Sequence, residues 1–395
     1  MKRLLFVVGS LSMGGAEKCL AEMLRHVDLE SYEVTVLALA HEKNMHRFDP
    51  RIRVINGYSS FDRVNLPLSQ FVPLALKKFR IAAVLKKARY WMDCRNGSKH
   101  PGQVMWRWLS CYVDPFEENF DAVIGYGQGT ASFFAIDKVP NGGMKILWVN
   151  TDLVRARYDI AGLATFYHRA DRVVTVSENV RRNVARWFPG CCDKLSVFYD
   201  IIDNQTIMEK GQEADPYPAN GKPRLLTVGR YCEAKALHLA IDAAAILAGK
   251  GIDFCWYLVG EGNLRPALEE QICSLGLEDR VILTGMQSNP YPWFANCDLY
   301  VQSSVFEGSC TTLTEAMIFN KVVVTTDIEI AFEKVVPGKN GFICNKAGAA
   351  IAENVERLLT DSGLKEQMEN WLAQNPVCYG NQMKDFYDLL EQHNG

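Results

Sequence analysis

Two glutamates, Glu307 and Glu315, stand in the stretch SSVFEGSCTTLTEAM, residues 303–317, with seven residues between them. Most of the intervening residues are small or hydroxylic, so their backbone amides are accessible to a ligand. A first interpretation is a helix capping box, with Thr312 as the N-cap and Glu315 reaching back to the first amides. A second is a glycosidase acid–nucleophile pair, although eight residues at helical rise span about 12 Å and hydrolase carboxylates lie about 5–9.5 Å apart.

A third interpretation places one carboxylate at each end of an extended sugar–diphosphate–ribose ligand. Glu315 would accept hydrogen bonds from two ribose hydroxyls, and Glu307 from hydroxyls of the sugar. Between them, backbone amides at a helix N-terminus would bind the diphosphate. The residues that carry these amides are Ser309, Cys310, Thr311 and Thr312. This interpretation accounts for the acids, the small side chains and the helix together.

A second group of charged residues lies in GRYCEAK, residues 229–235. Here Arg230, Glu233 and Lys235 come just past the carboxyl end of a strand that we predict at 225–228. Two cations in such a place can neutralise a diphosphate, because Arg offers a planar fork of donors and Lys a compact charge. The alternative is an ordinary solvated loop that opens a helix.

Two glycine-rich turns also follow predicted strands. LVGEGNLRP carries Gly260 and Gly262, and GSLSMGGAEK carries Gly14 and Gly15 at the start of a predicted helix. Such turns let backbone amides approach an anion closely. The second turn is not GxGxxG, and the nearest acid, Glu42, comes later than a dinucleotide-binding fold requires. Dinucleotide binding is therefore disfavoured.

Short apolar runs alternate with helical patterns along the whole chain, which predicts parallel sheets covered by helices on both faces. A polar, proline-rich break at 203–223 divides this rhythm into two halves. We predict an α/β protein with two Rossmann-like, doubly wound domains facing a cleft. The expected parts are a domain at 1–202, a domain at 203–375, and a helix at 376–395 that crosses back to the first domain.

The composition excludes several classes of protein. Of the 395 residues, 48% are hydrophobic and 23% are charged, and the net charge of −3 gives no electrostatic case for nucleic acid. The 12 cysteines include no CxxC pair, so we expect reduced thiols and no structural zinc. MKRLLFVVGS is too short for a signal-peptide core, and we found no uncharged apolar stretch of about 18 residues. We expect a cytoplasmic protein.

Five ordered motifs, GGAEK, VGRxxEAK, LVGEG, RVILTG and Glu-x7-Glu, resemble those of the retaining GT-B glycosyltransferases of the family 4 type. The resemblance spans nearly the entire chain. It implies that Arg230 and Lys235 contact the donor diphosphate, and that Glu307 contacts the donor sugar and Glu315 the ribose. It further implies that Gly15 faces the phosphates across the cleft and that the base lies near Gly285 and Met286.

The chain departs from the family pattern at two places. Many relatives carry His where ILWVNTD has Asn150, so Asn150 would orient the sugar through neutral hydrogen bonds, or Asp152 would share the task. The usual Glu-Lys pair of the phosphate loop is EAK here, with one residue between the acid and Lys235.

The residue types in these motifs predict sugar transfer without a metal or other cofactor. No DxD triplet occurs, whereas a metal-dependent diphosphate clamp usually needs clustered carboxylates. Arg230, Lys235 and a helix N-terminus can stabilise the leaving nucleoside diphosphate instead. The resemblance implies retention of configuration, with the departing phosphate accepting the acceptor's proton.

The segment 60–112 combines basic and aromatic residues. Within 70–112, nine Lys and Arg stand against one acid, a local charge of +8. This favours either contact with an anionic membrane surface, on the inner face of the cell membrane, or binding of a polyprenyl or other lipid-linked acceptor. The alternative is a solvated insertion that lines the acceptor site, because the cations of 77–89 scatter around a helix. The basic residues lie at 77, 78, 80, 86, 87, 89, 95, 99 and 107.

Three functions remain open. The first is a glycosyltransferase, using a UDP-sugar donor and a glycan or lipid-linked acceptor, in the assembly of bacterial surface polysaccharide or glycolipid. The second is a sugar-nucleotide epimerase or phosphorylase on the same scaffold, which would turn over without an acceptor. The third is a non-catalytic binder of nucleotide-sugars.

Overall fold

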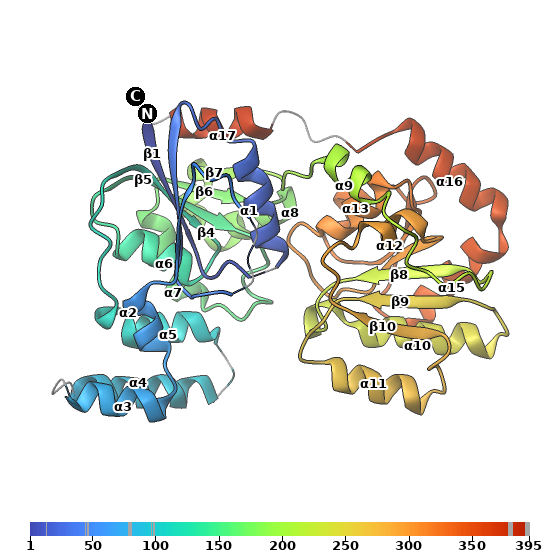
Figure 1. Cartoon of the computed structure of the whole chain (residues 1–395), viewed down its shortest axis with the longest axis horizontal. Coiled ribbons are helices and arrows are strands. Elements are labelled where there is room, and N and C mark those ends of the chain that lie inside the picture. Colours follow the sequence, from blue (N-terminus) through green and yellow to red (C-terminus); the bar gives the residue numbers. More distant parts are fainter. Residues whose placement is uncertain are drawn as a thin grey trace. The chain divides into compact units, whose positions relative to one another are not determined.

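Two units make up the chain in the computed structural model (Figure 1). The structure describes residues 1–12, 14–43, 45, 47–77, 81–95, 97, 99–377 and 382–391. Met1–Ile201 and Gly380–Gly395 form the first unit, and Ile202–Tyr379 form the second. The chain therefore leaves the first unit, completes the second, and returns to the first at its end.

The first unit is built on a sheet of seven parallel strands in the order β3-β2-β1-β4-β5-β6-β7. The apolar run Leu4–Val8 within β1 is at most 2% exposed, as expected for a central strand with both faces covered. The strands are β1 (Lys2–Val8), β2 (Tyr32–Ala38), β3 (Arg53–Asn56), β4 (Phe120–Tyr126), β5 (Gly142–Val149), β6 (Arg172–Thr175) and β7 (Leu195–Val197). The helices are α1 (Gly15–Arg25), α2 (Ser59–Asn65), α3 (Leu68–Lys77), α4 (Ile81–Arg95), α5 (Pro101–Leu109), α6 (Thr130–Asp137), α7 (Ile160–Arg169), α8 (Glu178–Trp187) and α17 (Gln382–Glu391), with short 3-10 helices η1 (Ser110–Tyr112) and η2 (Pro189–Lys194).

The last helix, α17, packs onto the first unit, which confirms the predicted return of the C-terminal helix. Phe386 is fully buried, with its ring centroid 6.2 Å from that of Phe6 in β1. Tyr387 stacks on Tyr32 at 5.4 Å, and its hydroxyl accepts a hydrogen bond of 2.8 Å from the amide of Asp28. Apolar burial and this polar contact together hold the helix in place.

The second unit is a sheet of six parallel strands in the order β10-β9-β8-β11-β12-β13. The order makes β8 and β11 neighbours, although many residues separate them in the chain. The strands are β8 (Arg224–Val228), β9 (Cys255–Val259), β10 (Val281–Gly285), β11 (Leu299–Gln302), β12 (Val323–Thr326) and β13 (Gly341–Cys344). The helices are α9 (Asn204–Lys210), α10 (Leu237–Gly249), α11 (Arg265–Ser274), α12 (Tyr291–Asn296), α13 (Thr311–Ile318), α14 (Ala331–Lys334), α15 (Gly348–Thr360) and α16 (Ser362–Gln374), with the 3-10 helix η3 (Glu233–Lys235).

The fold confirms the predicted α/β class with two parallel, Rossmann-like sheets. Helix α10 begins at Leu237, because the preceding Ala236 adopts a left-handed conformation with a φ of 44° that a continuous α-helix cannot contain. Within the described residues, no helix has both the length and the apolar content needed to cross a bilayer.

Candidate functional site

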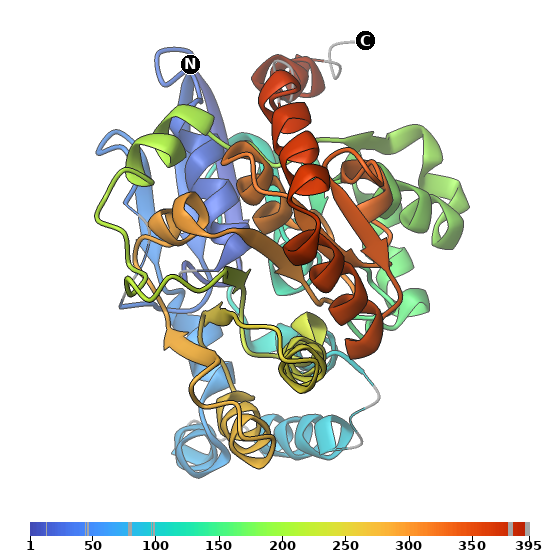
Figure 2. The same ribbon diagram turned by 90° about the vertical axis from the view of Figure 1, so that its right-hand side faces the viewer.

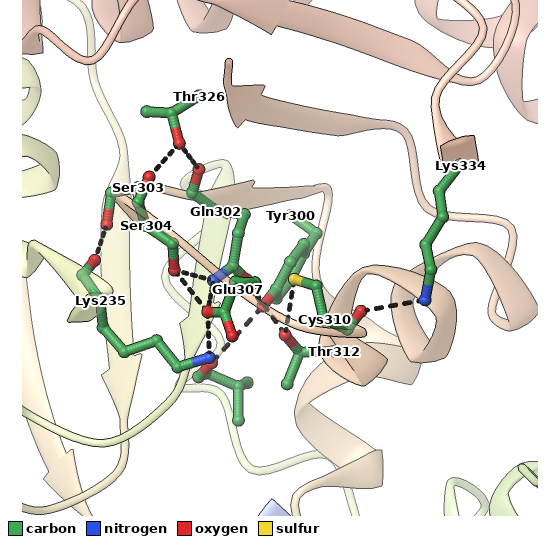
Figure 3. Close-up of polar contacts among 11 residues, drawn as sticks. Lys235, Tyr300, Gln302, Ser303, Ser304, Glu307, Cys310, Thr312, Thr326 and Lys334 are labelled. Atoms are coloured by element: carbon green, nitrogen blue, oxygen red, sulfur yellow. Dashed lines mark hydrogen bonds and ion pairs between the residues drawn. The ribbon is translucent and has the colours of Figure 1, made fainter. Parts of the chain in front are cut away.

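Glu307 is the centre of a polar network at the carboxyl end of β11 (Figure 3). Its Oε1 lies 2.5 Å from the Nζ of Lys235, 2.7 Å from the hydroxyl of Ser304 and 3.3 Å from the amide nitrogen of Gln302. The side chains of the ion pair are only 18% and 15% exposed for Lys235 and Glu307. Three donors therefore hold one carboxylate oxygen in a place largely shielded from water.

The Lys235 ammonium remains charged in this environment. Burial is the largest single effect and lowers its pKa, but the charge and hydrogen bond of Glu307, together with the nearby Cys310 and Cys232, outweigh burial, and the pKa is raised above the ordinary lysine value. The two residues meet because Lys235 follows β8 and Glu307 follows β11, and these strands are neighbours in the sheet. The sequence predicted that Lys235 lies just past a strand end, but it did not predict the contact of Lys235 with Glu307.

Gln302, the last residue of β11, fixes the orientation of Glu307. It is 1% exposed, and its amide nitrogen donates to Ser304 at 2.6 Å and to Glu307 at 3.3 Å. Its carbonyl oxygen accepts from the hydroxyl of Tyr300 at 2.6 Å and from that of Thr312 at 3.0 Å. Both donors and both acceptor positions of the amide are thus used, so the amide has a single orientation.

The capping-box interpretation of this stretch is wrong. Helix α13 begins at Thr311 with Cys310 as its N-cap, and Cys310 has a left-handed φ of 50° and makes no side-chain cap. Thr312 is inside the helix and binds Gln302. Burial, reinforced by the charge of Glu307, raises the pKa of the Cys310 thiol to about 11, so the thiol is neutral at physiological pH.

The start of α13 is a site of positive potential. The amides of Thr311 and Thr312 lie in the first helical turn, where no carbonyl of the helix can reach them. Lys334, from α14, adds a second cation: its Nζ donates to the hydroxyl of Thr314 at 2.7 Å and to the carbonyl of Cys310 at 3.5 Å. Lys334 was not predicted, since nothing in its spacing links it to the acids. Glu315, the fifth residue of α13, is 2% exposed.

Other predicted residues of the second unit lie outside this network. Arg230 follows β8 with an exposed side chain and, unlike Lys235, is not among the partners of Glu307. Met286 follows β10 and is 64% exposed. Ser309 lies in the loop between Glu307 and Cys310. Their roles stay predictions.

The glycine turn after β9 packs against the loop after β8. A Cβ on Gly260 would lie 1.9 Å from the carbonyl oxygen of Gly229, and one on Gly262 would lie 2.4 Å from that of Tyr231. Backbone hydrogen bonds join the two loops: the amide of Tyr231 donates to the carbonyl of Glu261 at 2.9 Å, and the amide of Leu264 donates to the carbonyl of Tyr231 at 3.1 Å. The two glycines thus have a packing role, whether or not the turn also binds a ligand.

We expect Gly262→Ala to lower the free energy of unfolding by about 1–3 kcal/mol, because the new methyl group overlaps backbone atoms that cannot rotate away. Urea unfolding measures this change. Gly249→Ala is the matched control, since a Cβ at Gly249 would meet no atom within 4 Å. Equal stability of the two variants would contradict the packing role.

The predicted residues of the first unit lie at strand ends. Gly14 is the N-cap of α1, where a Cβ would lie 2.3 Å from the Glu17 carboxylate, whereas a Cβ on Gly15 would meet nothing within 4 Å. Asn150 follows β5; its amide donates to the side-chain oxygen of Gln128 at 2.9 Å. Its own Oδ1 is buried and, within the described residues, has no hydrogen-bond partner.

Asp152 has a local structural role. Its Oδ1 accepts from the amides of Val154 at 2.9 Å and Arg155 at 3.0 Å, so it caps its own turn. Asn150 is therefore better placed than Asp152 to meet a ligand, because an unsatisfied buried oxygen is costly unless a donor arrives. Gln128, which positions Asn150, was not predicted; an isolated glutamine in a loop gives no pattern to detect.

In the part of the chain that the structure describes, neither unit alone gathers three His, Cys, Asp or Glu ligand atoms near one another. The predicted independence from metal ions stays a prediction.

Comparisons with known proteins agree with this arrangement. Residues 222–361 match the family described as "Glycosyl transferases group 1". The chain is 25% identical over 327 residues to N-acetylgalactosamine-N,N'-diacetylbacillosaminyl-diphospho-undecaprenol 4-alpha-N-acetylgalactosaminyltransferase of Campylobacter jejuni, which covers 83% of this chain and 81% of that protein. It is 30% identical over 179 residues to alpha-D-kanosaminyltransferase of Streptomyces kanamyceticus, or 45% and 46% of the two chains. The structure of Anabaena Alr3699/HepE in complex with UDP and glucose is similar, with a TM-score of 0.70 and 17% identity over 99% of this chain and 100% of that one.

Proposed function

We propose that this chain, a glycosyltransferase with the GT-B fold, moves a sugar from a UDP-sugar to a glycan or lipid-linked acceptor with retention of the anomeric configuration and without a metal ion. The observation that carries the proposal is the contact of Lys235 with Glu307 beside the open N-terminus of α13. It brings together a cation, a carboxylate and the first amides of a helix, which are the groups that the diphosphate and the sugar of such a donor require.

The donor lies along the loop from Glu307 to Glu315. The amides at the start of α13 bind the diphosphate together with Lys235, whose ammonium has three donors and can serve Glu307 and a phosphate oxygen at once. Glu307 accepts hydrogen bonds from the sugar hydroxyls, and Glu315 accepts those of the ribose. Arg230, exposed past β8, supplies a second cation on the phosphates.

Transfer breaks the bond between the anomeric carbon and the phosphate oxygen and forms a bond to the acceptor oxygen on the same face of the sugar. The acceptor's proton goes to the departing phosphate. Lys235 and the helix amides stabilise the negative charge that develops on the leaving group. Such preorganised electrostatic stabilisation is usually the largest single contribution to catalysis. Glu307 holds the sugar so that its anomeric carbon faces the acceptor.

In the first unit, the unpaired Oδ1 of Asn150 accepts a hydrogen bond from a hydroxyl of the donor sugar or of the acceptor. The name of the Campylobacter jejuni relative gives a diphospho-undecaprenol-linked glycan as that protein's acceptor. We extend this acceptor class to the present chain, because 83% of it aligns with that relative.

Thermal unfolding with UDP, GDP, ADP and NAD in parallel tests the donor class. A ligand at about 100 times its dissociation constant stabilises the fold by roughly 2.7 kcal/mol. We expect UDP to raise the melting temperature most, in EDTA as in magnesium. Stabilisation by NAD alone would overturn the proposal.

A transfer assay tests the reaction. We expect UDP release from UDP-sugars to require a polyprenyl-diphosphate glycan and to yield an extended glycan. Turnover of the donor with no acceptor would instead favour an epimerase or phosphorylase, and UDP binding without any turnover would favour a non-catalytic binder.

A further inference from the structure

The helical segment between β3 and β4 exposes an unusual number of apolar side chains. Helices α3 and α4 pack around Phe71, Ala75 and Ala83, a small core of their own. Six large apolar side chains of these two helices are nevertheless between 42% and 67% exposed. We call them the hairpin surface: Leu68, Leu76, Ile81, Leu85, Trp91 and Met92.

Helices α3 and α4, which carry the hairpin surface, lie at the end of the first unit that is far from the sheet. Figure 1 shows α3 and α4 below α2 and α5, which separate them from the strands. Figure 2 shows the same two helices at the end of the unit after a quarter turn. In both views no element of the first unit lies beyond these two helices.

The exposed residues of α4 form one stripe. Ile81, Leu85 and Met92 recur at a spacing that places them on the same side of an α-helix. Ala83 and Lys87 lie on the opposite side and are buried. A helix that covers one side with its own core and leaves a second apolar stripe exposed is built to contact something else.

Cations flank this stripe. Lys77, Arg89 and Arg95 are exposed, and the guanidinium of Arg95 lies 4.6 Å from the centroid of the Trp91 ring. Asp93, the one acid of the segment 70–112, accepts a hydrogen bond of 2.9 Å from the indole of Trp108. The hairpin surface is thus apolar with a positive border.

Some residues of the predicted basic and aromatic segment do not contribute. Lys87 is buried: its Nζ donates to the carbonyl of Val64 at 2.6 Å, and burial lowers its pKa. Phe71 and Trp106 are core residues. Lys78, Phe79 and Arg80 lie outside the described residues. The positive charge available to a partner is therefore smaller than the local charge of +8 counted from the sequence of residues 70–112.

We propose that the hairpin surface binds an anionic lipid bilayer, with Ile81, Leu85, Trp91 and Met92 entering the interface and Arg89 and Arg95 contacting the headgroups. Charge complementarity favours this occupant, because exposed cations on a helix with apolar side chains match acidic headgroups above acyl chains. Trp and Arg side by side are typical of an interfacial helix. The inference does not depend on the identity of the donor.

Sedimentation of the full chain with two kinds of vesicle tests the proposal: phosphatidylcholine alone, and phosphatidylcholine mixed with phosphatidylglycerol. We expect binding to the mixed vesicles at low salt and a loss of binding as salt increases. The double variant Leu85→Ser, Trp91→Ser should bind at least about tenfold less, because it removes the largest apolar contacts. The double variant Arg89→Gln, Arg95→Gln should bind the two kinds of vesicle equally, because it lacks the cations that favour anionic headgroups.

Leu275→Ser is the matched control: Leu275 is 44% exposed in the second unit, and its removal should leave vesicle binding unchanged. The melting temperature and its shift with UDP should be the same in all variants, which separates this proposal from the donor site. Absence of binding to the mixed vesicles at low salt would overturn it. So would a hairpin variant that changes the oligomeric state on gel filtration and keeps its vesicle binding, because the surface would then join two copies of the chain.

Discussion

Lys235→Met should lower kcat for sugar transfer by about 10²–10³-fold, the range found when one preorganised donor to a developing charge is removed. Methionine keeps the apolar stem but removes the ammonium that lies 2.5 Å from Glu307. The same change should weaken UDP binding, because the proposed diphosphate contact is lost. Steady-state kinetics and UDP titration measure the two effects.

Arginine at this position should restore little activity, because its planar fork does not fit a site made for a compact charge. Lys339→Met, at an exposed lysine of the same unit, should behave as the wild type. Unchanged kcat in Lys235→Met would contradict the assignment.

The same ion pair predicts how stability depends on pH. The pKa of Lys235 is raised in the folded state. Its contribution to the free energy of unfolding is therefore fully present below the pKa of lysine in the unfolded chain, about 10.4. This contribution is lost as the pH increases through the folded-state pKa. The contribution of Lys235 to the stability of the fold is therefore constant across the neutral range.

Glu307→Gln should lower kcat by a similar factor of about 10²–10³ and leave the affinity for UDP nearly unchanged. Glutamine keeps the shape and one acceptor oxygen for Ser304, but it lacks the charge that orients the sugar hydroxyls. UDP has no sugar at that end, and its diphosphate can pair with Lys235 in place of the lost carboxylate, so its affinity should change far less than the rate of transfer. Initial rates with saturating donor, beside calorimetry with UDP, separate the two quantities.

Glu366→Gln, at an exposed acid of α16, serves as the control for Glu307→Gln. The two variants should therefore differ in their effects. Lys235→Met should weaken UDP binding and lower kcat for transfer, whereas Glu307→Gln should lower kcat and leave UDP binding nearly unchanged. If UDP binding were lost in Glu307→Gln and transfer kept, the proposed orientation of the donor would be reversed.

Much of the fold follows from the sequence. Apolar runs such as Leu4–Val8 are buried strands, and the alternation of strands and helices gives the two parallel sheets. The contact of Lys235 with Glu307 does not follow from the sequence, because the two residues are 72 positions apart and only the strand order places β8 beside β11. Hydrophobic periodicity specifies which side of a strand is buried, not which strand is its neighbour.

Local conformation also escaped prediction. The capping box fits the letters TLTE, but Cys310 takes the N-cap in a left-handed conformation that ordinary residues avoid. Lys87 reads as a surface cation, yet it lies on the buried side of α4 and donates to a carbonyl. Both outcomes depend on tertiary contacts that override local preference.

Calorimetric titration of UDP in the presence of EDTA, on the wild type and on Glu315→Gln, tests the proposed donor site most directly. We predict that the wild type binds UDP without a divalent metal and that the variant binds it at least about tenfold more weakly, the equivalent of one hydrogen bond to a charged group. UDP binding that requires magnesium, or that is equal in the two proteins, would contradict a donor site at the start of α13.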